Sequence, residues 1–142
     1  MVDTENTENV GAKAQAEAQL KSIKEMFQAL NDAYNSDSDS SDDEINLAHD
    51  ALLSSPLSVE VRSDWTPLGD YFKAAEYRIL LCTGGPAVQV VGDLDAEGEP
   101  YNPELEYQDW FIPWVSYPLD DKEEKALLLY VNLILYDCPS LG

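Results

Sequence analysis

The spacing of apolar residues changes along this chain from a helical period to the alternation of strands. Between residues 12 and 34 the spacings are three and four, which places the apolar side chains in one stripe along a helix. From Leu57 onward apolar and polar residues alternate, as strands require. A chain in which helices precede a run of strands is predicted to adopt an α+β fold. The stripe consists of Ala16, Leu20, Ile23, Phe27, Leu30 and Tyr34.

Strand propensity and turn residues predict a small antiparallel sheet after residue 57. Residues 57–62 alternate cleanly, and residues 76–83 and 87–94 are rich in β-forming residues. The last two runs flank Gly84-Gly85-Pro86, which predicts a hairpin turn. Residues 105–111 are a further strand candidate, so we expect three or four strands.

Capping boxes mark two more helices. Ser41 with Glu44 predicts a short helix to about residue 53, and Asp120 with Glu123 predicts a helix over 121–136. The last helix is apolar almost all round from Ala126 onward, so it should pack on the sheet or be covered by a partner.

We therefore expect two N-terminal helices, the sheet and a C-terminal helix packed on it. The expected segments are a flexible acidic N-terminus (1–11), an amphipathic helix (12–34), a Ser/Asp linker (35–43) and an α+β domain (44–142). The amphipathic helix either packs on its own domain or forms a homodimer through residues 12–34.

Acidic residues dominate the charge of the chain. It carries 28 Asp and Glu against 8 Lys and Arg, a net charge of -20, and residues 79–121 hold nine carboxylates but no lysine or arginine. Such self-repulsion opposes compaction, which suggests that a partner outside the fold uses the charge. Direct nucleic-acid binding is disfavoured because phosphate contacts need basic clusters. With no secretory signal and no apolar run of roughly 20 residues, we expect a soluble, cytoplasmic protein.

Motifs for catalysis or cofactors are weak. Asp93, Asp95, Glu97, Gly98 and Glu104 match the spacing of a calcium-binding EF-hand loop, yet strands and prolines surround them, so we favour an acidic strand connection. The single histidine has no catalytic partner that we can identify. The two cysteines match no metal or redox spacing, and we favour free thiols over a disulfide. We expect no enzyme, no cofactor and no bound metal.

Residues 57–114 resemble a group of small proteins from phages and mobile elements of proteobacteria. The similarity lies in LSVEVRSDW, in EYRILLCTGGPAVQVVGDLD and in LEYQDWFIPW, of which LLCTGGPAV and YQDW are the most specific segments. That group brings no established activity. It implies a setting among the accessory genes of mobile DNA, where anti-CRISPR and anti-restriction proteins are common.

Our leading hypothesis is a non-enzymatic acidic inhibitor that mimics nucleic acid and blocks a DNA- or RNA-binding defence protein of bacteria. Twenty net charges equal the phosphate load of roughly ten base pairs. The alternative is an acidic adaptor or immunity-type protein that binds through its aromatic and apolar faces. The candidate partner-binding residues, with two tryptophans as anchors, are Asp93, Asp95, Glu97, Glu99, Glu104, Glu106, Asp109, Trp110, Trp114, Asp120 and Asp121.

Overall fold

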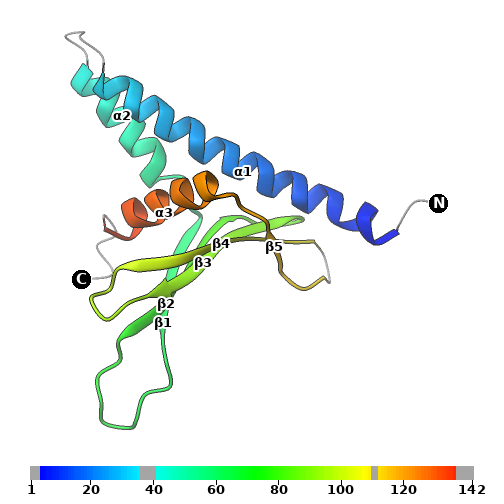
Figure 1. Ribbon diagram of the computed structural model, residues 1–142, viewed down its shortest axis with the longest axis vertical. Helices are drawn as coiled ribbons and strands as arrows, with labels where there is room; N and C mark the ends of the chain where they lie inside the picture. The colour runs from blue at the N-terminus through cyan, green and yellow to red at the C-terminus, as the bar shows by residue number, and fades with distance from the viewer. Residues whose placement is uncertain (1–3, 36–40, 110–111, 137–142) are drawn as a thin grey trace.

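The computed structural model describes residues 4–35, 41–109 and 112–136, and these form an α+β fold (Figure 1). Within them three helices accompany one antiparallel sheet of five strands, whose spatial order follows the chain order β1-β2-β3-β4-β5. The elements in order are α1 (Thr4–Tyr34), α2 (Ser41–Leu53), β1 (Ser58–Ser63), β2 (Ala74–Cys82), β3 (Ala87–Leu94), β4 (Pro100–Gln108), β5 (Val115–Tyr117) and α3 (Asp121–Tyr136).

The helices cover one face of the sheet. Figure 1 shows α1 and α3 on the same side of the strands, while α2 folds back along α1. The apolar stripe of α1 is buried at Ala16, Leu20 and Ile23, and α3 buries Tyr130 and Val131 in the same core. The stripe of α1 is thus covered by its own chain over these turns. At its end the stripe leaves the core, because Tyr34 is exposed.

Alternation along the strands separates core residues from polar residues. Ile79, Val90 and Leu105 lie side by side on β2, β3 and β4 and are fully buried beneath the helices. Their neighbours along each strand point to the opposite face, because successive side chains alternate. That opposite face, which no described helix covers, is called the open face below.

The helices were predicted well except at one boundary. α2 ends at Leu53 and α3 spans Asp121–Tyr136, as expected. α1, in contrast, begins at Thr4 rather than at residue 12, so most of the segment predicted to be a flexible N-terminus is helical. Extending a formed helix gains one hydrogen bond per residue, and Gly11 costs only about 1 kcal/mol, so it does not end the helix. None of the described helices is long and apolar enough to span a lipid bilayer.

The number of strands and the start of one strand were predicted wrongly. The sheet has five strands, because residues 115–117 add a short edge strand that three residues are too few to reveal in the sequence. β4 begins at Pro100 instead of residue 105. The hairpin around Gly84 is confirmed: β2 and β3 pair antiparallel, and Gly84 has a positive φ of 99°.

A β-bulge explains how β4 accommodates Pro103, whereas Pro100 is the first residue of the strand. Val91 pairs with Glu104 and Asp93 with Tyr101, so two residues of β4 oppose one residue of β3. Asn102, inside the bulge, has a positive φ of 54°. Proline is tolerated at bulges because the ladder is already interrupted there. The bulge lies opposite Gly92.

Gly92 leaves room for the buried ring of Tyr77, and this close approach gives a first prediction. A Cβ atom on Gly92 would overlap the Tyr77 ring and hydroxyl. Gly92→Ala should therefore lower the free energy of unfolding by about 1–3 kcal/mol, as overpacking does. Gly11→Ala meets nothing within 4 Å and should raise it by up to about 1 kcal/mol through helix propensity. Urea unfolding measures both, and equal effects would contradict the overlap at Gly92.

Candidate functional site

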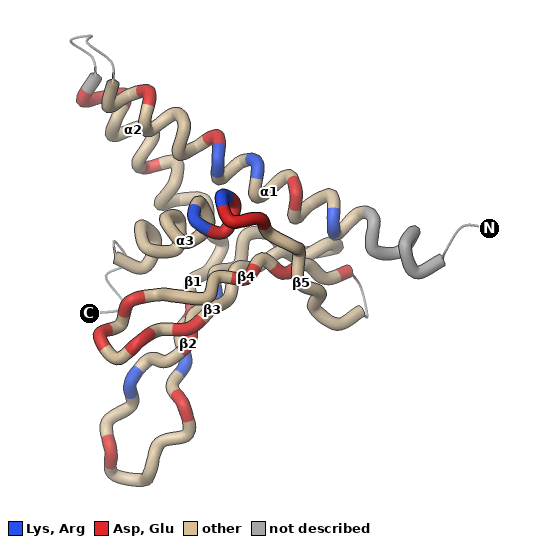
Figure 2. The backbone as a smooth tube through the Cα atoms, viewed as in Figure 1, with Lys and Arg blue, Asp and Glu red and all other residues tan. Residues whose placement is uncertain are grey.

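Six of the predicted carboxylates lie on one hairpin, which we call the acidic hairpin: β3, the turn of residues 95–99, and β4 (Figure 2). No lysine or arginine occurs anywhere in it. The six residues are Asp93, Asp95, Glu97, Glu99, Glu104 and Glu106.

The turn of the acidic hairpin is organised by Asp95. Its Oδ1 accepts hydrogen bonds from the backbone N–H groups of Glu97 and Glu99, both at 2.9 Å. Gly98 adopts a positive φ of 82°, which suits glycine in a tight turn. Asp95 therefore serves mainly to shape the turn, and the side chains of Glu97 and Glu99 are left exposed to solvent at its tip.

The other carboxylates of the hairpin lie on the open face. Asp93 and Glu76 are paired across β3 and β2, and Glu104 and Glu106 follow the same face of β4. Glu106 Oε1 accepts a hydrogen bond of 2.7 Å from Gln89 Nε2, and Asn102 Nδ2 donates to Asp93 Oδ2 at 3.2 Å. These contacts hold the acidic groups on the sheet surface instead of letting them move freely in solvent.

A broad groove of about 880 Å³ includes this surface. Its two halves differ in charge. Over β1 and β2, Arg78 Nη2 lies 2.8 Å from Glu60 Oε1, and Arg62 forms an ion pair with Glu76. The hydrogen bond from Arg62 lowers the pKa of the Glu76 carboxylate. Over β3 and β4 no such cations occur in the sequence, so the groove is neutralised on one side and negative on the other.

Tyr77 is a buried polar group in the wall of this groove. It is 2 % exposed, and its hydroxyl has no hydrogen-bond partner among the described residues. Burial raises the pKa of this phenol well above its usual value, and the carboxylates of Asp93 and Glu104 raise it further. A buried hydroxyl without a partner costs roughly 1–3 kcal/mol of stability.

Of the remaining predicted residues that the structure describes, only Trp114 lines the same groove as the acidic hairpin. Asp109 follows the end of β4 and is half-buried, and Trp114 is half-buried in the groove wall. Asp120 and Asp121 stand at the start of α3, in the helical layer. Trp110 lies outside the described residues. The expectation of a single acidic face with two tryptophan anchors is therefore met only by the hairpin and Trp114.

The EF-hand spacing falls on a strand connection, as expected. Asp93 lies within β3 and Glu104 within β4, so the ends of the twelve-residue motif are strand residues and no helix flanks it. In the described part of the chain, no group of three or more His, Cys, Asp or Glu side chains is placed to hold a metal ion.

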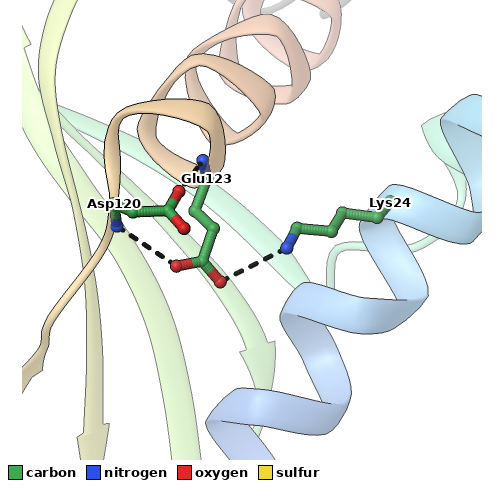
Figure 3. Close-up of polar contacts among 3 residues, drawn as sticks. All are labelled: Lys24, Asp120 and Glu123. Carbon is green, nitrogen blue, oxygen red and sulfur yellow. Dashed lines mark hydrogen bonds and ion pairs between the residues drawn. The ribbon is translucent and has the colours of Figure 1, made fainter.

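The capping box of α3 is confirmed and uses Asp120 for folding (Figure 3). Asp120 Oδ1 accepts from the Glu123 N–H at 2.7 Å, while Glu123 Oε1 accepts from the Asp120 N–H at 3.1 Å. The second oxygen of Glu123 accepts from Lys24 Nζ of α1 at 3.3 Å. The start of α3 is thus fastened both to its own backbone and to α1.

One prominent surface was missed by the sequence reasoning. Residues 64–73, the loop between β1 and β2, project away from the body of the molecule (Figure 1), and we call them the apolar arm. The arm carries four large exposed side chains, which are Trp65, Leu68, Tyr71 and Phe72. In the sequence these residues are interspersed with polar and turn-forming residues and have no helical or strand periodicity, and such a pattern does not distinguish buried from exposed side chains.

No family model matches the chain, and neither do the curated proteins or solved structures with which it was compared. Its function must therefore be inferred from the chemistry of its own surfaces.

Loss of the α3 cap gives the second prediction. Asp120→Ala removes the acceptor for the Glu123 N–H and should lower the free energy of unfolding by about 1 kcal/mol. Asp121→Ala is the matched control, because this exposed residue contributes mainly through the helix dipole, worth roughly 0.3–1 kcal/mol. Chemical unfolding of both variants measures the difference. A larger loss for Asp121→Ala would contradict the capping role of Asp120.

Alkaline unfolding gives the third prediction. The pKa of Tyr77 is raised in the folded state, so above about pH 10 the unfolded chain loses this proton first and is favoured. Stability from this group is complete below that pH and falls as pH rises. Between about pH 8 and about pH 11 the wild type should lose about 1 kcal/mol more than Tyr77→Phe.

Tyr71→Phe is the control for alkaline unfolding, because Tyr71 is fully exposed on the arm. It should follow the wild type at every pH, whereas Tyr77→Phe should be at least as stable as the wild type near neutral pH, having lost an unpaired hydroxyl. A marked loss of stability in Tyr77→Phe at neutral pH would show that the hydroxyl is bonded after all.

Proposed function

We propose that this protein is a non-enzymatic inhibitor that presents the acidic hairpin to the nucleic-acid-binding surface of another protein, in place of phosphates. The observation that carries the proposal is the gathering of six carboxylates on one hairpin that has no lysine or arginine of its own. Lysine and arginine side chains that normally meet phosphate would meet Asp and Glu instead. A bacterial defence protein of the CRISPR or restriction type is the target class that the resemblance of residues 57–114 favours.

The spacing of these carboxylates supports a shared electrostatic potential. Glu104 and Glu106 are two residues apart on β4, which corresponds to about 7 Å along a strand. That distance is below the Debye length of about 8 Å at physiological salt, so the potentials of neighbouring groups add. The hydrogen bonds to Glu106 and Asp93 keep part of the array in place before binding.

The number of carboxylates on the acidic hairpin limits the length of nucleic acid that the protein can mimic. Six charges correspond to roughly 10 Å of duplex, or about three base pairs, at one charge per 1.7 Å of axis. The proposed contact is therefore a short stretch of phosphate-binding surface and not a whole DNA groove. The remaining acids of the chain contribute a long-range field that speeds association.

A second candidate function is an adaptor that binds a protein through apolar contacts alone. The observation in its favour is the exposed apolar arm, because large solvent-exposed apolar side chains mark interaction sites. The two candidates differ in one measurable property. Mimicry requires an affinity that falls steeply with salt, whereas apolar docking does not.

The fourth prediction tests the mimicry. The full chain is immobilised and exposed to a nuclease-treated bacterial lysate, and bound proteins are challenged with a short DNA duplex. Glu97→Lys with Glu99→Lys should weaken binding on the order of 10- to 100-fold, because like charges then face the partner's cations. Both residues are exposed, so the fold should tolerate the change.

The control is Glu25→Lys with Asp50→Lys, which makes the same change in net charge on exposed positions of α1 and α2. It should leave binding within about threefold of the wild type, since distant exposed charges are screened. Binding that is indifferent to salt, or that the duplex does not displace, would rule out mimicry.

A further inference from the structure

The apolar arm exposes four large side chains. The relative exposures of Trp65, Leu68, Tyr71 and Phe72 are 104 %, 106 %, 98 % and 83 %. None contributes to the core, so their presence is not explained by folding. Exposed apolar groups of this size favour association, and tryptophan and tyrosine dominate binding hot spots.

The arm is a defined structure, not an unformed loop. A turn closes its tip, where the Asp70 N–H donates to the Pro67 carbonyl at 3.1 Å and Gly69 has a φ of 98°. This geometry is that of a turn with glycine at its third position. Thr66 Oγ1 also donates to the Asp64 carbonyl at 2.9 Å. A preformed arm loses little conformational freedom on binding.

The arm is joined to the acidic hairpin. Lys73, the last residue of the arm, donates a hydrogen bond to the carbonyl oxygen of Ala96 in the turn of the hairpin. Glu97, an exposed acid, is the next residue along that turn. Two more exposed acids, Asp64 and Asp70, lie on the arm itself. The base of the arm therefore contacts the turn of the acidic hairpin, and acidic residues lie on both segments (Figure 2).

The size of the apolar surface is appropriate for a stable contact. Aromatic side chains bury roughly 150–250 Å² each, so three of them with a leucine offer on the order of 600 Å². A standard interface buries about 800 Å² on each partner. The arm supplies most of this area, and the adjoining acids of the turn would supply the polar rim.

The charge of the chain indicates which kind of partner binds the apolar arm. A second copy would bring another -20 charges to the same place, and an anionic membrane surface would repel Asp64 and Asp70. In contrast, the carboxylates of Asp64 and Asp70 attract a protein whose apolar pocket is bordered by lysine and arginine. Charge complementarity therefore favours a basic protein partner.

We propose that the apolar arm inserts into an apolar pocket bordered by basic residues on the protein that the acidic hairpin recognises. This inference rests on the proposed function, because it concerns the same partner. The arm determines how long the complex persists, while the hairpin determines how fast it forms and how strongly salt weakens it.

The fifth prediction identifies the partner through the arm. Phe72 is replaced by the photo-crosslinker p-benzoylphenylalanine in the full chain, and a cell lysate is irradiated with it. The control carries the same group at Tyr34, an exposed aromatic residue at the end of α1, far from the arm. Cross-links to apolar residues with lysine or arginine around them, found only with the arm probe, would support the proposal.

The partner that the cross-link identifies is then purified on its own, and its binding kinetics separate the role of the arm from the role of the acidic hairpin. Trp65→Ala and Phe72→Ala should each speed dissociation about 10-fold or more at every salt concentration, with the salt dependence unchanged. Tyr34→Ala should have no effect. These exposed substitutions should leave stability nearly unchanged, which thermal unfolding verifies.

The outcomes distinguish failure of the inference from failure of the proposed function. If the arm variants dissociate like the wild type while Glu97→Lys with Glu99→Lys abolishes binding, the arm inference is wrong and mimicry stands. If the arm variants dissociate faster than the wild type, and salt does not change the affinity of the wild type, mimicry is wrong. A dimer that sedimentation detects for the wild type but not for Trp65→Ala would overturn the inference in favour of a second copy of this chain. Binding to phosphatidylglycerol vesicles that Trp65→Ala loses would overturn it in favour of a membrane surface.

Discussion

Coverage of the sheet on one face only is the constraint from which the other features follow. α1 and α3 bury Ile79, Val90 and Leu105, and the period-two alternation of the strands then sends their neighbours to the open face. Neighbours such as Arg78 and Glu104 can be charged because they remain in water, where a charged group keeps its hydration. The groove and its acids are thus a consequence of how the core is built, and a second helical layer over the open face would remove them.

The same constraint explains how the fold tolerates its charge. Repulsion is largest where acids are close and unpaired, and the described structure separates these places from the core. Two arginines neutralise Glu60 and Glu76 over β1 and β2. Near the core, Glu123 is both part of the α3 cap and an ion-pair partner of Lys24. Six of the nine acids in residues 79–121, a stretch without lysine or arginine, lie on the acidic hairpin.

The sequence was sufficient where local signals decide structure. The stripe of α1, the cap at Asp120 and the turn at Gly84 each depend on neighbours within a few residues, and the structure contains all three. The strand β5 and the early start of β4 depend on pairing across the sheet, and no local pattern reports that. Pro103 fits into β4 because it lies in the bulge opposite Gly92, and Pro100 fits because it is the first residue of the strand.

The candidate site was predictable in composition but not in geometry. Residues 93–106 form one hairpin because strand pairing brings both ends of the acidic run together, whereas Asp120 belongs to a helix cap. The arm was missed for a different reason: its apolar residues have no period, so their exposure becomes known only when the core is seen to be complete without them. A chain of this charge resists its own association. It can therefore keep four apolar side chains in water, as the proposed docking to a basic surface requires.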